Sequence, residues 1–131
     1  MKTNELTGAA LDWAVAQCEG LNPILGSSFE RGHADGLDRY PFVYLHEPMK
    51  HNIAAPAFYT GYTPSVSWWI GGEIIERERI ELVPDEIWNA YKQDQHIPNT
   101  GMTPLIAAMR CYVASKLGDD VEVPEEVVLD K

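Results

Sequence analysis

The chain contains 131 residues, close to the common size of a single domain with one hydrophobic core. Apolar residues make up 45% of the sequence and charged residues 23%, a balance typical of globular proteins that excludes an intrinsically disordered chain. The formal net charge is −10, and the arginines are scattered, which argues against binding to duplex nucleic acid.

The negative charge is concentrated in the C-terminal segment GDDVEVPEEVVLDK, which begins at Gly118. This segment holds six acidic residues and one lysine. Segments with so much like charge are usually solvated. We therefore expect one domain over residues 1–131, ending in an acidic tail over residues 118–131.

Targeting and membrane signals are weak. The start MKTNELTG has no apolar stretch of the secretory kind, and no apolar run approaches the roughly 20 residues of a membrane span. Cys18 and Cys111 lack the spacing of zinc or redox motifs and are interpreted as small buried residues. These features lead us to expect a cytoplasmic protein without membrane contact.

The first predicted element is a helix over residues Leu6 to Cys18. Thr7 can cap its start, apolar residues recur at helical spacing, and Gly20 can end it. From Leu21 to Tyr40 no period is sustained, so we predict a long loop. Loops longer than about 12 residues tend to be functional, which makes GSSFERGHADGLDRYP a candidate lid or rim.

The middle of the chain predicts a strand, a short helix and a hairpin. PFVYLHE, ending at Glu47, has the composition of a strand, and an irregular stretch follows it through Gly61. Residues Glu73 to Arg79 are compatible with a strand or a short helix, and we favour the helix. The hairpin runs from Ile80 to Tyr91, with its turn built on Pro-Asp.

The last predicted helix has the clearest boundaries. Thr103 is its N-cap, Pro104 takes the first helical position, and Gly118 ends it. Its apolar face should make it the central packing element; the residues of this face are Leu105, Ala108, Met109, Tyr112, Val113 and Leu117. The elements together predict an α+β fold, a layered sandwich in which two main helices and one short helix pack on a small antiparallel sheet.

No catalytic or metal-binding constellation is recognisable. The four histidines (His33, His46, His51 and His96) have neither i, i+4 nor HxH spacing, so we expect no metal. The serines lie outside any GxSxG motif. We therefore expect neither an enzyme nor a cofactor.

The starts of the last helix and of the short helix favour ligand binding, because free N–H groups and the helix dipole attract anions there. The candidate ligand-binding residues are Tyr62, Ser65, Gly71, Thr100 and Thr103 near these starts, Trp68 and Trp69 for base stacking, and Arg31, Arg39 and Arg77 for an anion. Arg79 is a further possible anion contact. A capping role for the threonines, a core position for one tryptophan and a solvated face for ERER are the structural alternatives.

Three blocks of the sequence resemble the NinX-type family of small proteins encoded in the nin region of lambdoid phages. The blocks are LTGAALDWAVAQCEG, YTPSVSWWIGGEIIERERIEL and TPLIAAMRCYVASKLGDDVEVP. In the middle block the residues that match the family pattern are Tyr62, Pro64, Ser65, Trp68, Gly71, Gly72, Ile74, Ile75, Glu76 and Arg77. Ser67 replaces an acid of that pattern and Glu73 a proline. The resemblance implies a phage accessory protein in the host cytoplasm, with an α-β-α sandwich by analogy.

These features lead to two hypotheses. The first is an anti-defence protein that binds and sequesters a small nucleotide-derived immune signal without cleaving it, with a homo-oligomer able to close pockets between subunits. The alternative is an acidic protein-interaction module that inhibits or redirects a host protein. Cleavage of the nucleotide is a third, enzymatic possibility.

Overall fold

The computed structural model describes residues 1–26, 42–47 and 58–128. Within these ranges the chain forms three α-helices, two short 3-10 helices and two three-stranded antiparallel sheets. This arrangement confirms the α+β class. Arg31, Arg39 and the rest of the predicted lid beyond Gly26 lie outside the described residues.

The elements follow one another in chain order as η1 (Thr3–Glu5), α1 (Gly8–Cys18), β1 (Pro23–Gly26), β2 (Phe42–Glu47), β3 (Phe58–Gly61), α2 (Trp68–Glu78), β4 (Glu81–Val83), β5 (Trp88–Tyr91), β6 (Asn99–Gly101), α3 (Pro104–Leu117) and η2 (Glu125–Val128). None of the helices in the described ranges is long and apolar enough to cross a membrane.

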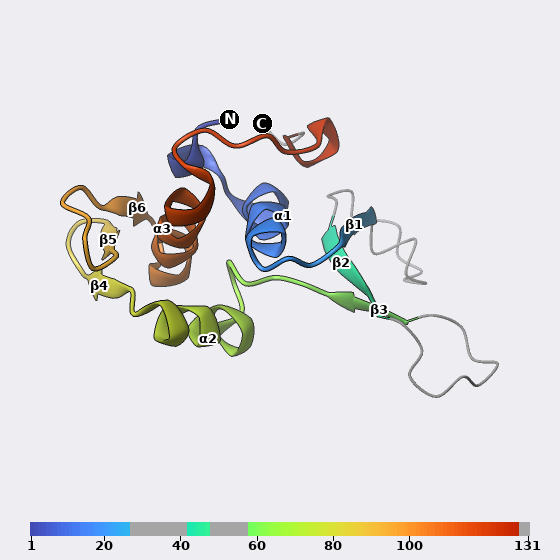
Figure 1. Cartoon of the computed structure of the whole chain (residues 1–131), viewed down its shortest axis with the longest axis horizontal. Helices are drawn as coiled ribbons and strands as arrows, with labels where there is room; N and C mark the ends of the chain where they lie inside the picture. Colours follow the sequence, from blue (N-terminus) through green and yellow to red (C-terminus); the bar gives the residue numbers. More distant parts are fainter. Residues whose placement is uncertain (27–41, 48–57, 129–131) are drawn as a thin grey trace.

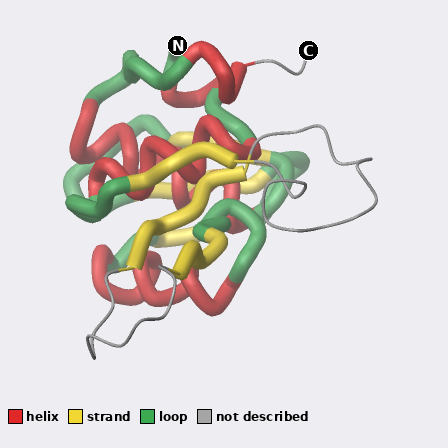
Figure 2. Tube along the Cα trace, turned by 90° about the vertical axis from the view of Figure 1, so that its right-hand side faces the viewer, coloured by secondary structure: helices red, strands yellow, loops and turns green. Residues whose placement is uncertain are grey.

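Helix α3 is the central element (Figure 1). It packs against the sheet β4-β5-β6 and also contacts α1 and α2. The other sheet, β1-β2-β3, contacts α1, and Figure 2 looks onto this sheet. Helices α1 and α3 therefore lie between two sheets. The sequence predicted one small sheet, and the structure adds a second.

The caps predicted for α3 are present. The Thr103 hydroxyl accepts a hydrogen bond from the N–H of Ile106 at 3.1 Å, Pro104 opens the helix, and Gly118 follows its end. Seven residues of α3 are buried. Six of them have apolar side chains, and the seventh is Tyr112. Leu117, which was predicted on the apolar face, is the last residue of α3 and is 43% exposed.

Helix α2 begins earlier than predicted, at Trp68 rather than at Glu73, and it contains the glycine pair. Gly71 lies where α2 meets α3 and the segment before α2. A Cβ built on it would lie 2.6 Å from the carbonyl oxygen of Pro64 and 2.7 Å from a methyl carbon of Leu105. The absence of a side chain at Gly71 therefore allows α2 to lie this close to Pro64 and to Leu105 of α3.

The predicted hairpin is confirmed as β4 and β5, which pair with Leu82 opposite Ala90. One face of this hairpin turns toward α3, and Ala90 on it is fully buried. Side chains alternate across a strand, so Glu81 and Tyr91, which are also opposite each other, lie on the outer face. Strand β6 lies between the hairpin and α3, where no strand was predicted.

Strand β2 confirms the strand predicted at Pro41 to Glu47. Its partners β1 and β3 fall in stretches that were predicted to be irregular, and those predictions were wrong at both places. Each partner is four residues long. Strands this short become regular through pairing with a neighbour rather than through their own pattern.

The acidic segment after Gly118 is only partly solvated. Asp119, Asp120, Glu122 and Glu125 are exposed as expected, but Val121 and Val127 belong to the core and are 5% and 8% exposed. The segment also pairs with the N-terminus, where the Thr3 hydroxyl donates to the Gly118 carbonyl at 2.6 Å. Residues 118–128 are therefore an integral part of the fold.

Candidate functional site

Three of the predicted ligand-binding residues are buried. Tyr62 is 7% exposed, Ser65 is 2% exposed, and Gly71 lies in the contact between α2 and α3. The backbone N–H of Ser65 donates to Asp12 Oδ1 of α1 at 2.9 Å. These residues therefore fix the turn that leads into α2.

Asp12 is a buried carboxyl group that the sequence analysis did not single out. Burial raises its pKa to about 7, and the hydrogen bond from Ser65 offsets only part of this effect. A hint was present in the sequence, because Asp12 stands among the apolar residues of the first helix. A carboxyl group in that position needs a partner, and Ser65 supplies it.

Both tryptophans of the pair are exposed. The exposed fraction is 56% for Trp68 and 86% for Trp69, so the prediction that one ring lies in the core was wrong. The inward face of α2 is formed by Gly71 and Ile74, and both tryptophans lie off that face. Trp69 shares its side of the helix with Glu73, which is also exposed.

Arg77 is held by groups of the protein itself. Its guanidinium donates to Glu19 Oε1 at 3.1 Å and to Glu78 Oε2 at 3.0 Å, and it lies over the ring of Tyr112. Lys92 Nζ donates to Glu78 Oε1 at 2.8 Å. The run ERER is therefore more than a solvated face, because it connects α2 to α1 and to β5.

The carboxylates of this ion-pair cluster are stabilised in their charged form. Burial alone would raise the pKa of Glu19, but hydrogen bonds from Arg77 and Tyr112 outweigh it and lower the pKa. Hydrogen bonds from Lys92 and Arg77 lower the pKa of Glu78. Partly exposed pairs of this kind contribute about 0.2–1 kcal/mol each. Arg77 therefore acts as a connection between helices.

Thr100 and Thr103 lie on the approach to α3. The N–H of Thr100 donates to Asn4 Oδ1 at 3.2 Å, and its carbonyl accepts from Arg110 at 2.7 Å. The Thr103 hydroxyl is occupied by its cap. A ligand-binding role for either hydroxyl stays a prediction.

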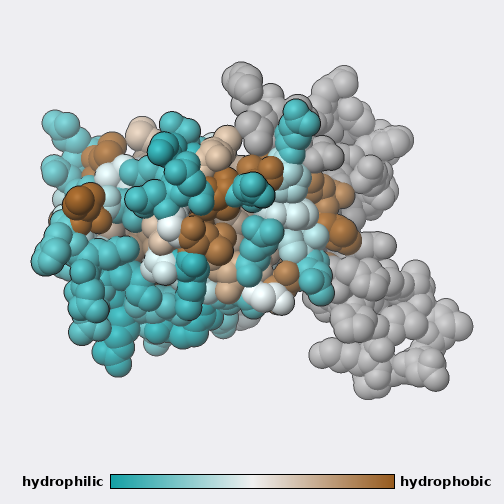
Figure 3. Space-filling model, turned by 45° about the horizontal axis from the view of Figure 1, so that its top comes forward, coloured by the Kyte–Doolittle hydropathy of each residue, from teal (hydrophilic) through white to brown (hydrophobic). Residues whose placement is uncertain are grey.

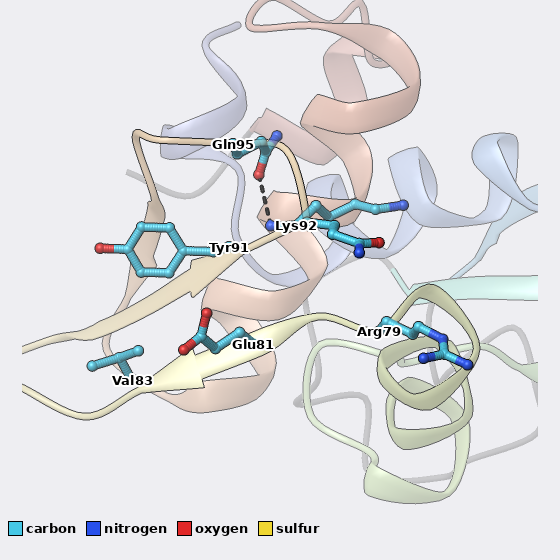
Figure 4. Close-up of a pocket in the computed structure, with 7 residues that line it drawn as sticks. Arg79, Glu81, Val83, Tyr91, Lys92 and Gln95 are labelled. Atoms are coloured by element: carbon cyan, nitrogen blue, oxygen red, sulfur yellow. Dashed lines mark hydrogen bonds between the residues drawn. The ribbon is translucent and has the colours of Figure 1, made fainter.

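A pocket opens on the outer face of the β4–β5 hairpin, with a volume of about 640 Å³ (Figure 4). Its lining residues are Arg79, Glu81, Val83, Tyr91, Lys92, Gln93 and Gln95. Of the predicted contacts that the structure describes, Arg79, named as a further anion contact, belongs to it, and the other eight do not. The volume falls in the range of about 300–1,000 Å³ that small-molecule sites occupy.

The pocket is shaped by α2, by the two strands and by the turn after β5. Gln95 folds back over this turn, because its backbone N–H donates to the Lys92 carbonyl at 2.9 Å and its side-chain oxygen accepts from the Lys92 N–H at 3.0 Å (Figure 4). The thiol of Cys111 donates to the same oxygen. The turn is thereby anchored to α3.

Arg79 occupies the C-cap of α2 in the left-handed conformation, with φ 55° and ψ 49°. It is the one residue other than glycine with a positive φ in the described ranges. Glycine is the usual residue at such a position, because a Cβ is strained there. The structure records no ion pair for Arg79 among the described residues, and its side chain lines the pocket.

The alternation of the hairpin was the sequence signal for this pocket. Ile80 is buried and Leu82 packs against the core. Their neighbours Arg79, Glu81 and Val83 therefore had to lie on the opposite face. The sequence did not reveal that the turn after Tyr91 closes one end of this face.

The residues that line the pocket are mainly polar or charged. Hydrophilic residues cover much of the left-hand part of the face in Figure 3, which is the side of β4, β5 and β6 in Figure 1. No group of three His, Cys, Asp or Glu side chains suited to a metal ion occurs among the described residues. Burial raises the pKa of Cys111 to about 11, so its thiol is not a ready nucleophile at neutral pH.

Comparison with known proteins places the chain in a family. No curated protein matches the sequence. The family model described as "Bacteriophage P22, NinX" matches residues 2–116. This match covers both sheets and the three helices except Leu117, the last residue of α3. The chain is therefore a member of the bacteriophage P22 NinX family.

Proposed function

We propose that this NinX-family protein binds a small nucleotide-derived molecule without cleaving it and withholds it from the antiviral signalling of the host. The observation that carries the proposal is the lining of the hairpin pocket. It combines the guanidinium of Arg79, the phenol ring of Tyr91 and the side-chain amides of Gln93 and Gln95.

Each of these groups suits one part of a nucleotide. A guanidinium binds phosphate oxygens with two parallel hydrogen bonds, and an aromatic ring stacks on a base for about 1–3 kcal/mol. Side-chain amides both donate and accept, as the edge of a base requires. Gln93 is exposed, and its amide is therefore accessible.

Calorimetric titration with cyclic di- and trinucleotides and with ADP-ribose derivatives tests the proposal. We expect at least one of them to bind at micromolar concentration or tighter, and to be recovered intact after denaturation of the complex. Absence of binding across the panel would exclude sequestration of these signals, and recovery of a cleaved product would identify an enzyme.

Arg79→Gly separates binding from folding. Glycine prefers the left-handed conformation that Arg79 adopts, so the melting temperature should stay constant or rise. Loss of the guanidinium should weaken ligand binding at least tenfold. The matched control is Lys2→Gln, which removes a cation that pairs with Asp120 at the termini, outside the pocket. Equal binding by both variants would contradict a role of Arg79.

A second candidate function is a protein-interaction module. It is favoured by the exposure of Trp68 and Trp69 beside Val66, which is 72% exposed. Exposed aromatic clusters often mark protein interfaces, and tryptophan is enriched among residues that dominate binding energy. The surface formed by these three residues is separate from the lining of the pocket.

Affinity purification from host lysate tests this candidate. The wild-type protein should retain one stoichiometric partner, and Trp68→Ala with Trp69→Ala should lose it while the melting temperature changes little. Retention of the same partner by the double variant would exclude this surface. Deletion of residues 118–131 is not a suitable test of the acidic segment, because it removes the buried Val121 and Val127.

A further inference from the structure

The two cations of the pocket are not equivalent. Lys92 Nζ lies 2.8 Å from Glu78 Oε1, so its charge is already matched inside the protein. Arg79 has no such partner among the described residues. Arg79 is therefore the cation in this pocket with an unmatched charge to offer a ligand.

A carboxylate lies in the same lining. Glu81 is opposite Tyr91 in the register of the hairpin and is exposed, and Figure 4 shows its carboxylate beside the Tyr91 ring and apart from the Arg79 guanidinium. A second phosphate charge near Tyr91 would meet this carboxylate without a cation to balance it. Like charges at such short range repel each other.

The Glu81 carboxylate also needs hydrogen-bond donors from the ligand. An ionised Glu81 only accepts hydrogen bonds, and the donors that a nucleotide offers are its ribose hydroxyls and the exocyclic amines of its base. Carboxylates commonly recognise the ribose hydroxyls of bound nucleotides. With the base stacked on Tyr91, the attached ribose comes within reach of the neighbouring residue Glu81.

We infer that the pocket takes one nucleotide unit that carries a single phosphodiester charge and a free ribose hydroxyl, with Arg79 on the phosphate and Glu81 on the hydroxyl. This inference rests on the proposed function and narrows its ligand class. It disfavours terminal monophosphates, diphosphates and triphosphates. A larger cyclic oligonucleotide places one of its units in the pocket.

Calorimetry with small probes tests the inference. The probes are the 3′,5′-cyclic mononucleotides of the four bases, which carry one charge and a free 2′-hydroxyl, and the corresponding 5′-monophosphates and 5′-triphosphates. At least one cyclic mononucleotide should bind tenfold or more tightly than its 5′-monophosphate and triphosphate. The 2′-deoxy form of the best cyclic probe should bind at least fivefold more weakly.

Glu81→Gln provides the specific control. It keeps the size of the side chain and removes its charge, so the preference for the cyclic mononucleotide over the triphosphate should fall to less than threefold. Tighter binding of triphosphates by the wild-type protein would overturn the inference and leave the proposed function intact. Absence of binding by every probe and every member of the larger panel would overturn both.

Discussion

At the scale of single residues, Asp12 shows how one buried carboxyl group ties helix α1 to the turn before α2. Its folded-state pKa of about 7 exceeds the ordinary value of 3.8. A group with a raised pKa stabilises the fold fully below its unfolded pKa, and this contribution is lost as the pH rises through the folded pKa. The free energy of unfolding should therefore fall between about pH 4 and pH 8.

We expect this fall to reach up to about 4 kcal/mol, and we expect Asp12→Asn to abolish most of it. Asparagine keeps an oxygen that accepts from the Ser65 N–H, but it cannot ionise. Urea unfolding at pH 5, 6, 7 and 8 measures the difference between the two proteins. The lowered pKa values of Glu19 and Glu78 act in a lower pH range and affect both proteins alike. Parallel pH profiles would contradict the assignment.

Predictability from the sequence also differs from residue to residue. Thr103 and Gly118 were identified correctly because capping depends on local chemistry. The exposure of both tryptophans was not, because it depends on where α2 crosses α3. Arg77 was predicted to meet a ligand anion, yet it binds Glu19, a residue 58 positions away that no local pattern connects to it.

At the scale of elements, α2 depends on its glycine pair in two different ways. Gly71→Ala would place a methyl group 2.6 Å from the Pro64 carbonyl oxygen, which is backbone and cannot swing away. We expect a loss of about 1–3 kcal/mol in the free energy of unfolding. Chemical denaturation measures this loss.

Gly72→Ala is the matched control one residue along the same helix. A Cβ at Gly72 would meet only Trp68 Cε3, at an ordinary contact distance of 3.7 Å. Alanine also favours the helix by up to about 1 kcal/mol over glycine, so this variant should be as stable as the wild type or more stable. A similar loss in both variants would mean that the contact of Gly71 with Pro64 does not limit the packing.

Elements with local signals were predicted well. The first helix follows from its periodicity, although Thr7, predicted to cap it, makes no side-chain hydrogen bond at the N-cap of α1. The last helix and the hairpin follow from caps and turn residues. The short strands β1 and β3 were missed because their regularity comes from pairing with β2. The pocket needs both the alternation of β4 and the fold of the turn that begins at Lys92, and only the first of these is visible in the sequence.

At the scale of the whole molecule, the net negative charge and the lining of the pocket both act against highly charged anionic ligands. The formal net charge of −10 repels polyanions in general, whereas the pocket offers one unmatched guanidinium. We therefore expect the protein to discriminate by charge, because a singly charged ligand would be repelled less at a distance than a triphosphate. This long-range effect favours the same ligand class that the pocket lining favours.

The two ends of the described chain are joined (Figure 1). The ammonium group of Met1 donates to the Val121 carbonyl at 2.9 Å, and the N–H of Thr3 donates to the Asp119 carbonyl at 2.8 Å. During synthesis, Met1 and Thr3 must therefore wait for residues 118–128 to leave the ribosome before they find these partners. Until then α1 lacks its contact with η2, and the core lacks Val121 and Val127, so a ribosome that stalls before this point carries a chain with an incomplete core.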